Sequence, residues 1–220
     1  MNRAFMLLGL TAFTAPALVA QEDVAARLQG RVPPAVAAAV SALIDTARAR
    51  GLPGTPLVDK ALEGAVKGVP AERIVPAVRT VLDQLNASAN ALHDAGIANP
   101  SDQAVEAGAF AIAAGMTVSD VAAIAGTANQ GHPAAVALQV AGALAALGVP
   151  RPETVGLVRA EIQSGRPLGD LVSLPGQVQA AMAGGALPAA AAAGLERAAA
   201  AHQTTPPRGQ GKGPVNPHKP

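Results

Sequence analysis

The sequence predicts an all-α protein of stacked two-helix (helix-turn-helix) repeats, forming a short α-solenoid or an irregular helical bundle, with a disordered C-terminal tail. Three observations predict this fold. Glycine followed by an apolar residue recurs along the chain, prolines stand where helices would begin, and apolar residues between them follow helical spacing. β-branched residues never alternate with polar ones over a useful length, so no strand is expected.

The first 20 residues are typical of a secretory signal peptide. Arg3 gives a positive start, residues 4–20 carry no charge, and acidic residues begin at Glu22. We expect cleavage after Ala20, with Ala17 as the second choice. The alternative is an uncleaved anchor, but the uncharged stretch is short and interrupted for a span of about 20 apolar residues. We therefore expect the chain to contact a membrane only through the transient signal segment.

The 220-residue chain contains no cysteine, so an exported form must be stable without disulfides. This composition favours the bacterial periplasm or extracellular space. The only aromatic residue after the signal segment is Phe110, and the formal net charge of the whole chain is +1. Nucleic-acid binding is not expected, because it calls for stacking aromatics or a dense basic stripe.

Glycine and proline mark the predicted helix boundaries. A glycine just past a helix adopts the left-handed conformation, and the apolar residue after it packs back on the last turn. Such endings are expected at Gly51, Gly68, Gly96, Gly115 and Gly148. Helix starts are expected at Thr55-Pro56, Asn99-Pro100 and Arg151-Pro152, with Thr55 and Asn99 as caps.

Three short helices follow from these marks, over residues 56–68, 100–115 and 152–165. A second helix begins after each of them, at Pro70, Thr117 and Pro167, which gives a repeat of 47 to 50 residues. Thr117 and Asp120 form a predicted capping box. The expected buried stripes are Val58, Ala61 and Ala65; Val105, Gly108 and Ile112; Val155, Val158 and Ile162; and Ile74, Val121 and Leu171 in the second helices.

Further helices complete the predicted repeat domain, residues 21–202. One spans 34–50 with Val36, Val40, Leu43 and Ala47 inward, and another spans 134–147. The helix from Pro70 turns Ile74, Val78, Val81, Leu82 and Leu85 inward, and Pro76 either kinks it or moves its start to about Val75. Pro175-Gly176 and Gly184-Gly185 bound alanine-rich helices up to about Ala201. Residues 203–220 are basic, rich in proline and glycine, and predicted to be disordered.

Catalytic and metal-binding patterns are not found in the sequence. His93, His132, His202 and His218 are far apart, and each is expected to have a solvated structural role. No GxSxG motif and no cysteine nucleophile occur. We therefore expect a protein with no catalytic residues, no cofactor and no bound metal.

The candidate functional residues are a charged strip formed by Asp59, Lys60, Glu63 and Lys67. Their spacing allows ion pairs on a solvated helix face, each contributing about 0.3 kcal/mol, and the same face is a possible partner surface. The function expected is that of an exported non-catalytic scaffold for a protein or an anionic envelope polymer. The alternative is a carrier that holds a small apolar ligand or lipid between helices.

Overall fold

The computed structural model describes residues 27–204, and these residues form helices and no strand. This confirms the predicted all-α fold with repeated helical packing. The predicted signal segment, residues 1–20, lies outside the described residues, as does the predicted tail from residue 205 onward. The helices are α2 (Pro34–Ala49), α3 (Thr55–Val66), α4 (Ala71–Asp94), α5 (Asp102–Ala113), α6 (Val118–Ala125), α7 (Ala134–Ala146), α8 (Arg151–Ser164), α9 (Leu168–Ala183) and α10 (Pro188–Thr204).

The described residues divide into two compact units. The first comprises residues 27–46 and 54–79, and the second comprises residues 47–53 and 80–204. The boundaries fall inside two helices. Helix α2 supplies its residues up to Thr46 to the first unit, and α4 supplies its residues up to Arg79; the residues that follow in each helix belong to the second unit.

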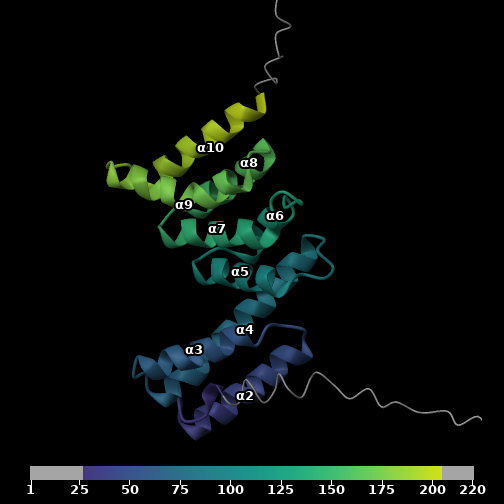
Figure 1. The fold of residues 1–220 in the computed structure, drawn as a ribbon, viewed down its shortest axis with the longest axis vertical. Coiled ribbons are helices and arrows are strands. Elements are labelled where there is room, and N and C mark those ends of the chain that lie inside the picture. The colour runs from purple at the N-terminus through teal and green to yellow at the C-terminus, as the bar shows by residue number, and fades with distance from the viewer. Residues whose placement is uncertain (1–26, 205–220) are drawn as a thin grey trace, which may run out of the picture. The chain divides into compact units, whose positions relative to one another are not determined.

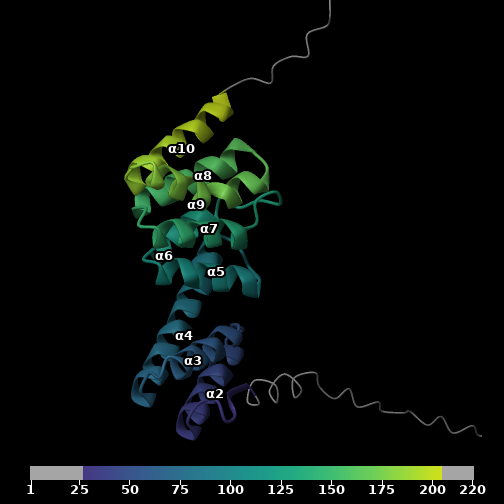
Figure 2. The ribbon, with the colours of Figure 1, turned by 60° about the vertical axis from the view of Figure 1, so that its left-hand side comes forward.

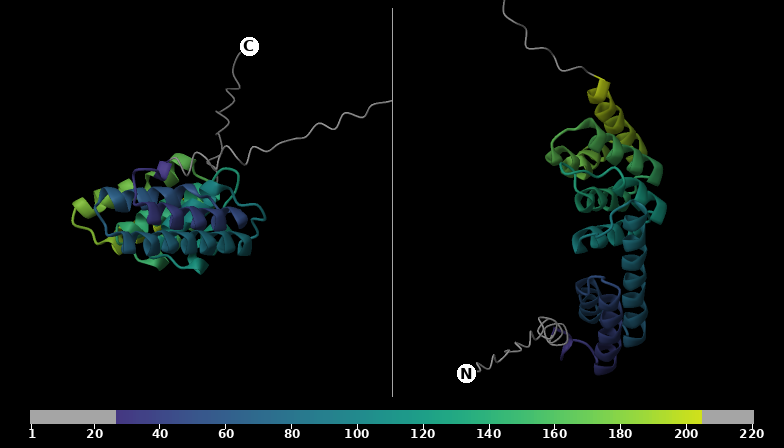
Figure 3. Two further views of the ribbon diagram at one scale, coloured as in Figure 1. Left: turned by 90° about the horizontal axis from the view of Figure 1, so that it is seen from below. Right: turned by 90° about the vertical axis from the view of Figure 1, so that its right-hand side faces the viewer.

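The first unit contains α2, α3 and the beginning of α4, which lie side by side (Figure 3). Gly64 of α3 faces Ile74 of α4 so closely that a Cβ at Gly64 would lie 3.0 Å from Ile74 Cγ1. The predicted stripe of α2 is correct except that Ile44 is buried where Leu43 was expected. The fully buried residues of this unit are Leu28, Val40, Leu57, Val58, Ala61 and Val78.

The second unit repeats one packing pattern (Figures 1 and 2). Helix α5 contacts α6 and α7, and α6 contacts α7; in the same way α8 contacts α9 and α10, and α9 contacts α10. Helix α7 joins the two groups through contacts with α8 and α9, and α6 also contacts α8. The predicted helix pairs α5–α6 and α8–α9 are therefore each completed by a third helix, α7 or α10, in an equivalent position.

The predicted glycine endings are confirmed. Gly51, Gly68, Gly96, Gly115 and Gly148 all have positive φ. At each of them the amide of the following apolar residue donates to the carbonyl five residues earlier, over 2.9 to 3.1 Å. This is the Schellman bond that satisfies a carbonyl left free at the helix end.

Helix starts agree with the sequence prediction in part. Thr117 and Asp120 form the predicted capping box at the start of α6. The cap of α5 is Ser101 and not Asn99, because Ser101 directly precedes the first helical residue and its Oγ accepts the Ala104 amide at 3.2 Å. Thr55 is itself the first residue of α3 and follows Gly54, so it is not the predicted cap.

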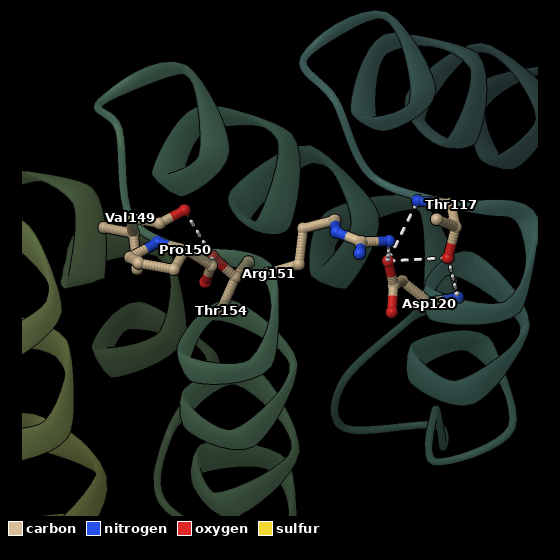
Figure 4. A network of polar contacts seen from close by, with 6 residues as sticks. All are labelled: Thr117, Asp120, Val149, Pro150, Arg151 and Thr154. Carbon is tan, nitrogen blue, oxygen red and sulfur yellow. Dashed lines mark hydrogen bonds and ion pairs between the residues drawn. The ribbon is translucent and has the colours of Figure 1, made fainter.

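A polar network connects the start of α6 with the start of α8 (Figure 4). Asp120 Oδ2 accepts hydrogen bonds from the Thr117 amide at 2.9 Å and the Thr117 hydroxyl at 2.7 Å, and it lies 3.4 Å from Arg151 Nη1. Thr154, one turn into α8 and fully buried, donates from Oγ1 to the Pro150 carbonyl at 3.1 Å. The buried hydroxyl is thus satisfied by the backbone that precedes its own helix.

Two predicted helix boundaries are absent. Helix α4 begins at Ala71 and continues through Pro76, so its start does not move to Val75. Helix α9 continues through Pro175, which was expected to end it. Leu174 and Val178 are buried on either side of that proline, so one apolar face is maintained and its packing offsets the lost hydrogen bond. Helix α10 ends at Thr204, so residues 203 and 204, which were predicted to begin the tail, belong to the helix.

Candidate functional site

The predicted charged strip lies on α3 and the residue that caps it. Lys60 Nζ is 3.0 Å from Glu63 Oε2, and Lys67 Nζ is 2.5 Å from Glu63 Oε1. The structure therefore brings Lys60, Glu63 and Lys67 into one network. Asp59 is not part of it and pairs instead with Arg27, whose Nη2 lies 2.6 Å from Asp59 Oδ1.

The opposite face of α3 holds the helix in the first unit, where Leu57, Val58 and Ala61 are fully buried. The strip residues are left at the surface, and Val66 beside Lys67 is 87% exposed. An exposed network of this kind contributes little to folding, because solvent screens the charges and the long side chains lose rotamer freedom when they pair. The strip can contact another molecule through positive and negative side chains and through the apolar side chain of Val66.

Electrostatics in the strip centre on Glu63. Hydrogen bonds from Lys67 and then from Lys60, together with the positive charges of both, lower the pKa of the Glu63 carboxyl from 4.5 to about 2. Glu63 is therefore ionised at any physiological pH and keeps the two lysines oriented along the helix.

A second polar group lies within the second unit, and the sequence prediction missed it. Glu161, in the last turn of α8, is 1% exposed. Its Oε1 lies 3.5 Å from Arg166 Nε, which is closer to Asp170 Oδ2, at 2.8 Å. Burial, opposed by the positive charge of Arg166, raises the pKa of the Glu161 carboxyl above 4.5. Arg166 is thus shared between a buried carboxylate and a half-exposed one.

His132 lies near this group and is 5% exposed, which corrects the expectation that each histidine is solvated. A tight turn directs it inward: the His132 amide donates to Asn129 Oδ1 at 2.9 Å, and the Asn129 amide donates to the His132 carbonyl at 3.1 Å. Positive charge on His132 or on His202 of α10 lowers the pKa of the Glu161 carboxyl. Neither His132 Nε2 nor Glu161 Oε1 has a hydrogen-bond partner among residues 27–204.

One signal for this buried group was present in the sequence. Gly165 ends α8 with φ +69°, yet it is followed by Arg166 where the other predicted endings have an apolar residue. A charged residue in a position that normally packs against the helix indicates a buried partner. The partner could not be identified from the sequence, because His132, Glu161 and His202 come from three separate segments.

Among the described residues, no group of three or more histidine, cysteine or acidic residues could hold a metal ion. No helix between residues 27 and 204 is long and apolar enough to cross a membrane. Comparison of the chain with protein-family models, curated proteins and solved structures finds no match.

Proposed function

We propose that this protein is an exported, non-catalytic helical protein of the bacterial periplasm or extracellular space that presents a surface of its helices to a partner molecule. The repeated packing of α5–α7 and α8–α10 supports this proposal most directly. Proteins assembled from repeated helical units bury one side of each helix against neighbours and leave extended outer faces for binding.

The charged strip is the proposed contact surface. It offers Lys60 and Lys67 on either side of Glu63, with Arg27 and Asp59 paired beside them. An anionic polymer would be attracted by the lysines and repelled by the two carboxylates. A protein that presents charges of both signs can complement the whole strip, and such complementarity provides specificity. Of the two partner classes, the strip therefore favours a protein.

Export is tested by expressing the full chain in a bacterium and determining the N-terminus and intact mass of the protein in the periplasmic fraction. The expected product begins at Gln21. A variant that lacks residues 1–20 serves as the control and should remain in the cytoplasm. A full-length chain retained in the membrane fraction would contradict cleavage and support an anchor.

The contact surface is tested by placing a photo-crosslinking amino acid at Lys60 in cells that express the protein naturally. Arg73, an exposed cation on α4 of the same unit, provides the matched control position. We expect one adduct of discrete mass from position 60, none from position 73, and loss of the adduct when Glu63→Lys reverses the central charge. Equal crosslinking at both positions would refute the surface, and a lipid bound at fixed stoichiometry in native mass spectrometry would favour the carrier.

A further inference from the structure

The end of α8 differs chemically from the other glycine-terminated helices. At Gly51, Gly68, Gly96, Gly115 and Gly148, an apolar residue follows the glycine and bonds to the carbonyl five residues earlier. At Gly165 the following residue is Arg166, and the residue five positions earlier is Glu161. The Arg166 amide donates to Ser164 Oγ at 3.3 Å, and its guanidinium approaches Glu161. A contact between a carboxyl and a guanidinium thus occupies the place of the usual apolar contact.

Three segments outside α8 contribute charged or titratable groups that affect the pKa of Glu161. His132 comes from the turn before α7, Asp170 from α9 and His202 from α10. Helix α7 itself, Ala134–Ala146, contains no charged residue. The remaining charged groups of α6, α8 and α10 are Asp120, which pairs with Arg151 at the other end of α8, and Glu153, Arg159, Glu196 and Arg197.

These contacts disfavour an ionised Glu161. The carboxyl is 1% exposed and lies in the last turn of α8, where the helix dipole is negative. Arg166 already donates to Asp170 at 2.8 Å and is 3.5 Å from Glu161. An ionised Glu161 would have to draw Arg166 away from Asp170 or admit water to the end of the helix.

We propose that Glu161 and Arg166 form a pH-responsive contact that holds the turn between α8 and α9, closed when Glu161 carries a proton and opened when Glu161 ionises. The proton comes from solvent and resides on the Glu161 carboxyl. Opening exposes the end of α8 and the start of α9, because Arg166 is the residue that joins them. This contact lies in the second unit and does not depend on the charged strip of α3.

Hydrogen exchange of the full chain tests the proposal directly. Protection factors of the amides from residue 162 to residue 170 are measured between pH 4.5 and pH 8. Protection in the unmodified protein should fall by up to about tenfold for each pH unit until the carboxyl is ionised, because the change from the closed to the open contact releases one proton. Glu161→Gln should remove this pH dependence, and the control Asp102→Asn, an exposed carboxylate of α5, should keep it. An unchanged slope in Glu161→Gln overturns the proposal.

A direct titration provides a second test that requires no folded Glu161 variant. Carbon-13 NMR of the side-chain carboxyls of the unmodified protein should show Glu161 titrating above pH 4.5. In Arg166→Gln the midpoint should move higher, because the positive charge that favours ionisation is lost. A Glu161 midpoint at or below 4.5, or a midpoint that Arg166→Gln leaves unchanged, contradicts the proposed contact.

Discussion

Arg151 Nη1 of α8 lies 3.4 Å from Asp120 Oδ2, the same oxygen that accepts the Thr117 amide at the start of α6 (Figure 4). One carboxylate therefore both caps a helix and reaches the first residue of another. The two roles differ in strength, since a cap satisfies a free backbone amide, whereas a half-exposed ion pair at this distance is weak.

Substitutions should separate these roles. We expect Asp120→Ala to lower the free energy of unfolding by about 1 kcal/mol, because α6 loses half of its capping box. Arg151→Ala should lower it by less than about 1 kcal/mol. Urea denaturation of both variants, with Arg159→Ala as the control for truncating an exposed arginine of α8, measures the difference. A larger loss from Arg151→Ala than from Asp120→Ala would contradict this assignment.

Gly142 permits the close approach of α5 and α7. A Cβ at Gly142 would lie 2.6 Å from Phe110 Cε1 and 3.2 Å from Ala111 Cα. We expect Gly142→Ala to destabilise the protein by about 1 to 3 kcal/mol, because the backbone of α5 leaves little room to adjust. Gly194→Ala in α10 is the matched control, since a Cβ there meets nothing within 4 Å, and it should be neutral or stabilise by up to about 1 kcal/mol. Thermal unfolding of both variants tests the contrast.

Gly148 is constrained by backbone conformation and not by space. Its φ is +84°, and a Cβ added there would meet no atom within 4 Å. Gly148→Ala should therefore cost about 1 to 2 kcal/mol through strain in the left-handed region. Chemical denaturation should show this loss, and Gly148→Asn should recover part of it, because asparagine tolerates that region better than alanine. Equal stability of the alanine variant and the unmodified protein would show that the turn relaxes.

Features set by neighbouring residues were predictable from the sequence. Glycine followed by valine at 148–149 predicts a left-handed helix end, and Thr117 with Asp120 predicts a capping box, because each feature closes within a few residues. Pro175 was misjudged because the packing of Leu174 and Val178 outweighs the local penalty of a proline. That packing depends on the other helices of the unit.

The two candidate sites also differ in how far the sequence alone predicts them. Lys60, Glu63 and Lys67 are three and four residues apart, so their contacts could be predicted from helical spacing. Burial of Glu161 with His132 requires the turn after α6 to be placed against the end of α8. Sequence spacing contains no information on that placement. The signal in the sequence was Arg166 directly after Gly165, where an apolar residue follows each of the five predicted glycine endings.

The contributions of Glu63 and Glu161 to the free energy of unfolding should depend on pH in opposite directions. Glu63 has a folded pKa of about 2, below its usual 4.5, so its contribution is present above pH 4.5 and is lost as the pH falls toward 2. Glu161 has a raised folded pKa, so its contribution is full below pH 4.5 and is lost as the pH rises through the folded value. Glu63→Gln should therefore reduce the acid-side loss of stability, and Glu161→Gln should reduce the loss at higher pH. Salt distinguishes them further: added sodium chloride should weaken the exposed Glu63 effect and leave the buried Glu161 effect largely intact. Denaturant midpoints recorded across pH at low and high salt would contradict this assignment if both variants changed the same side of the profile.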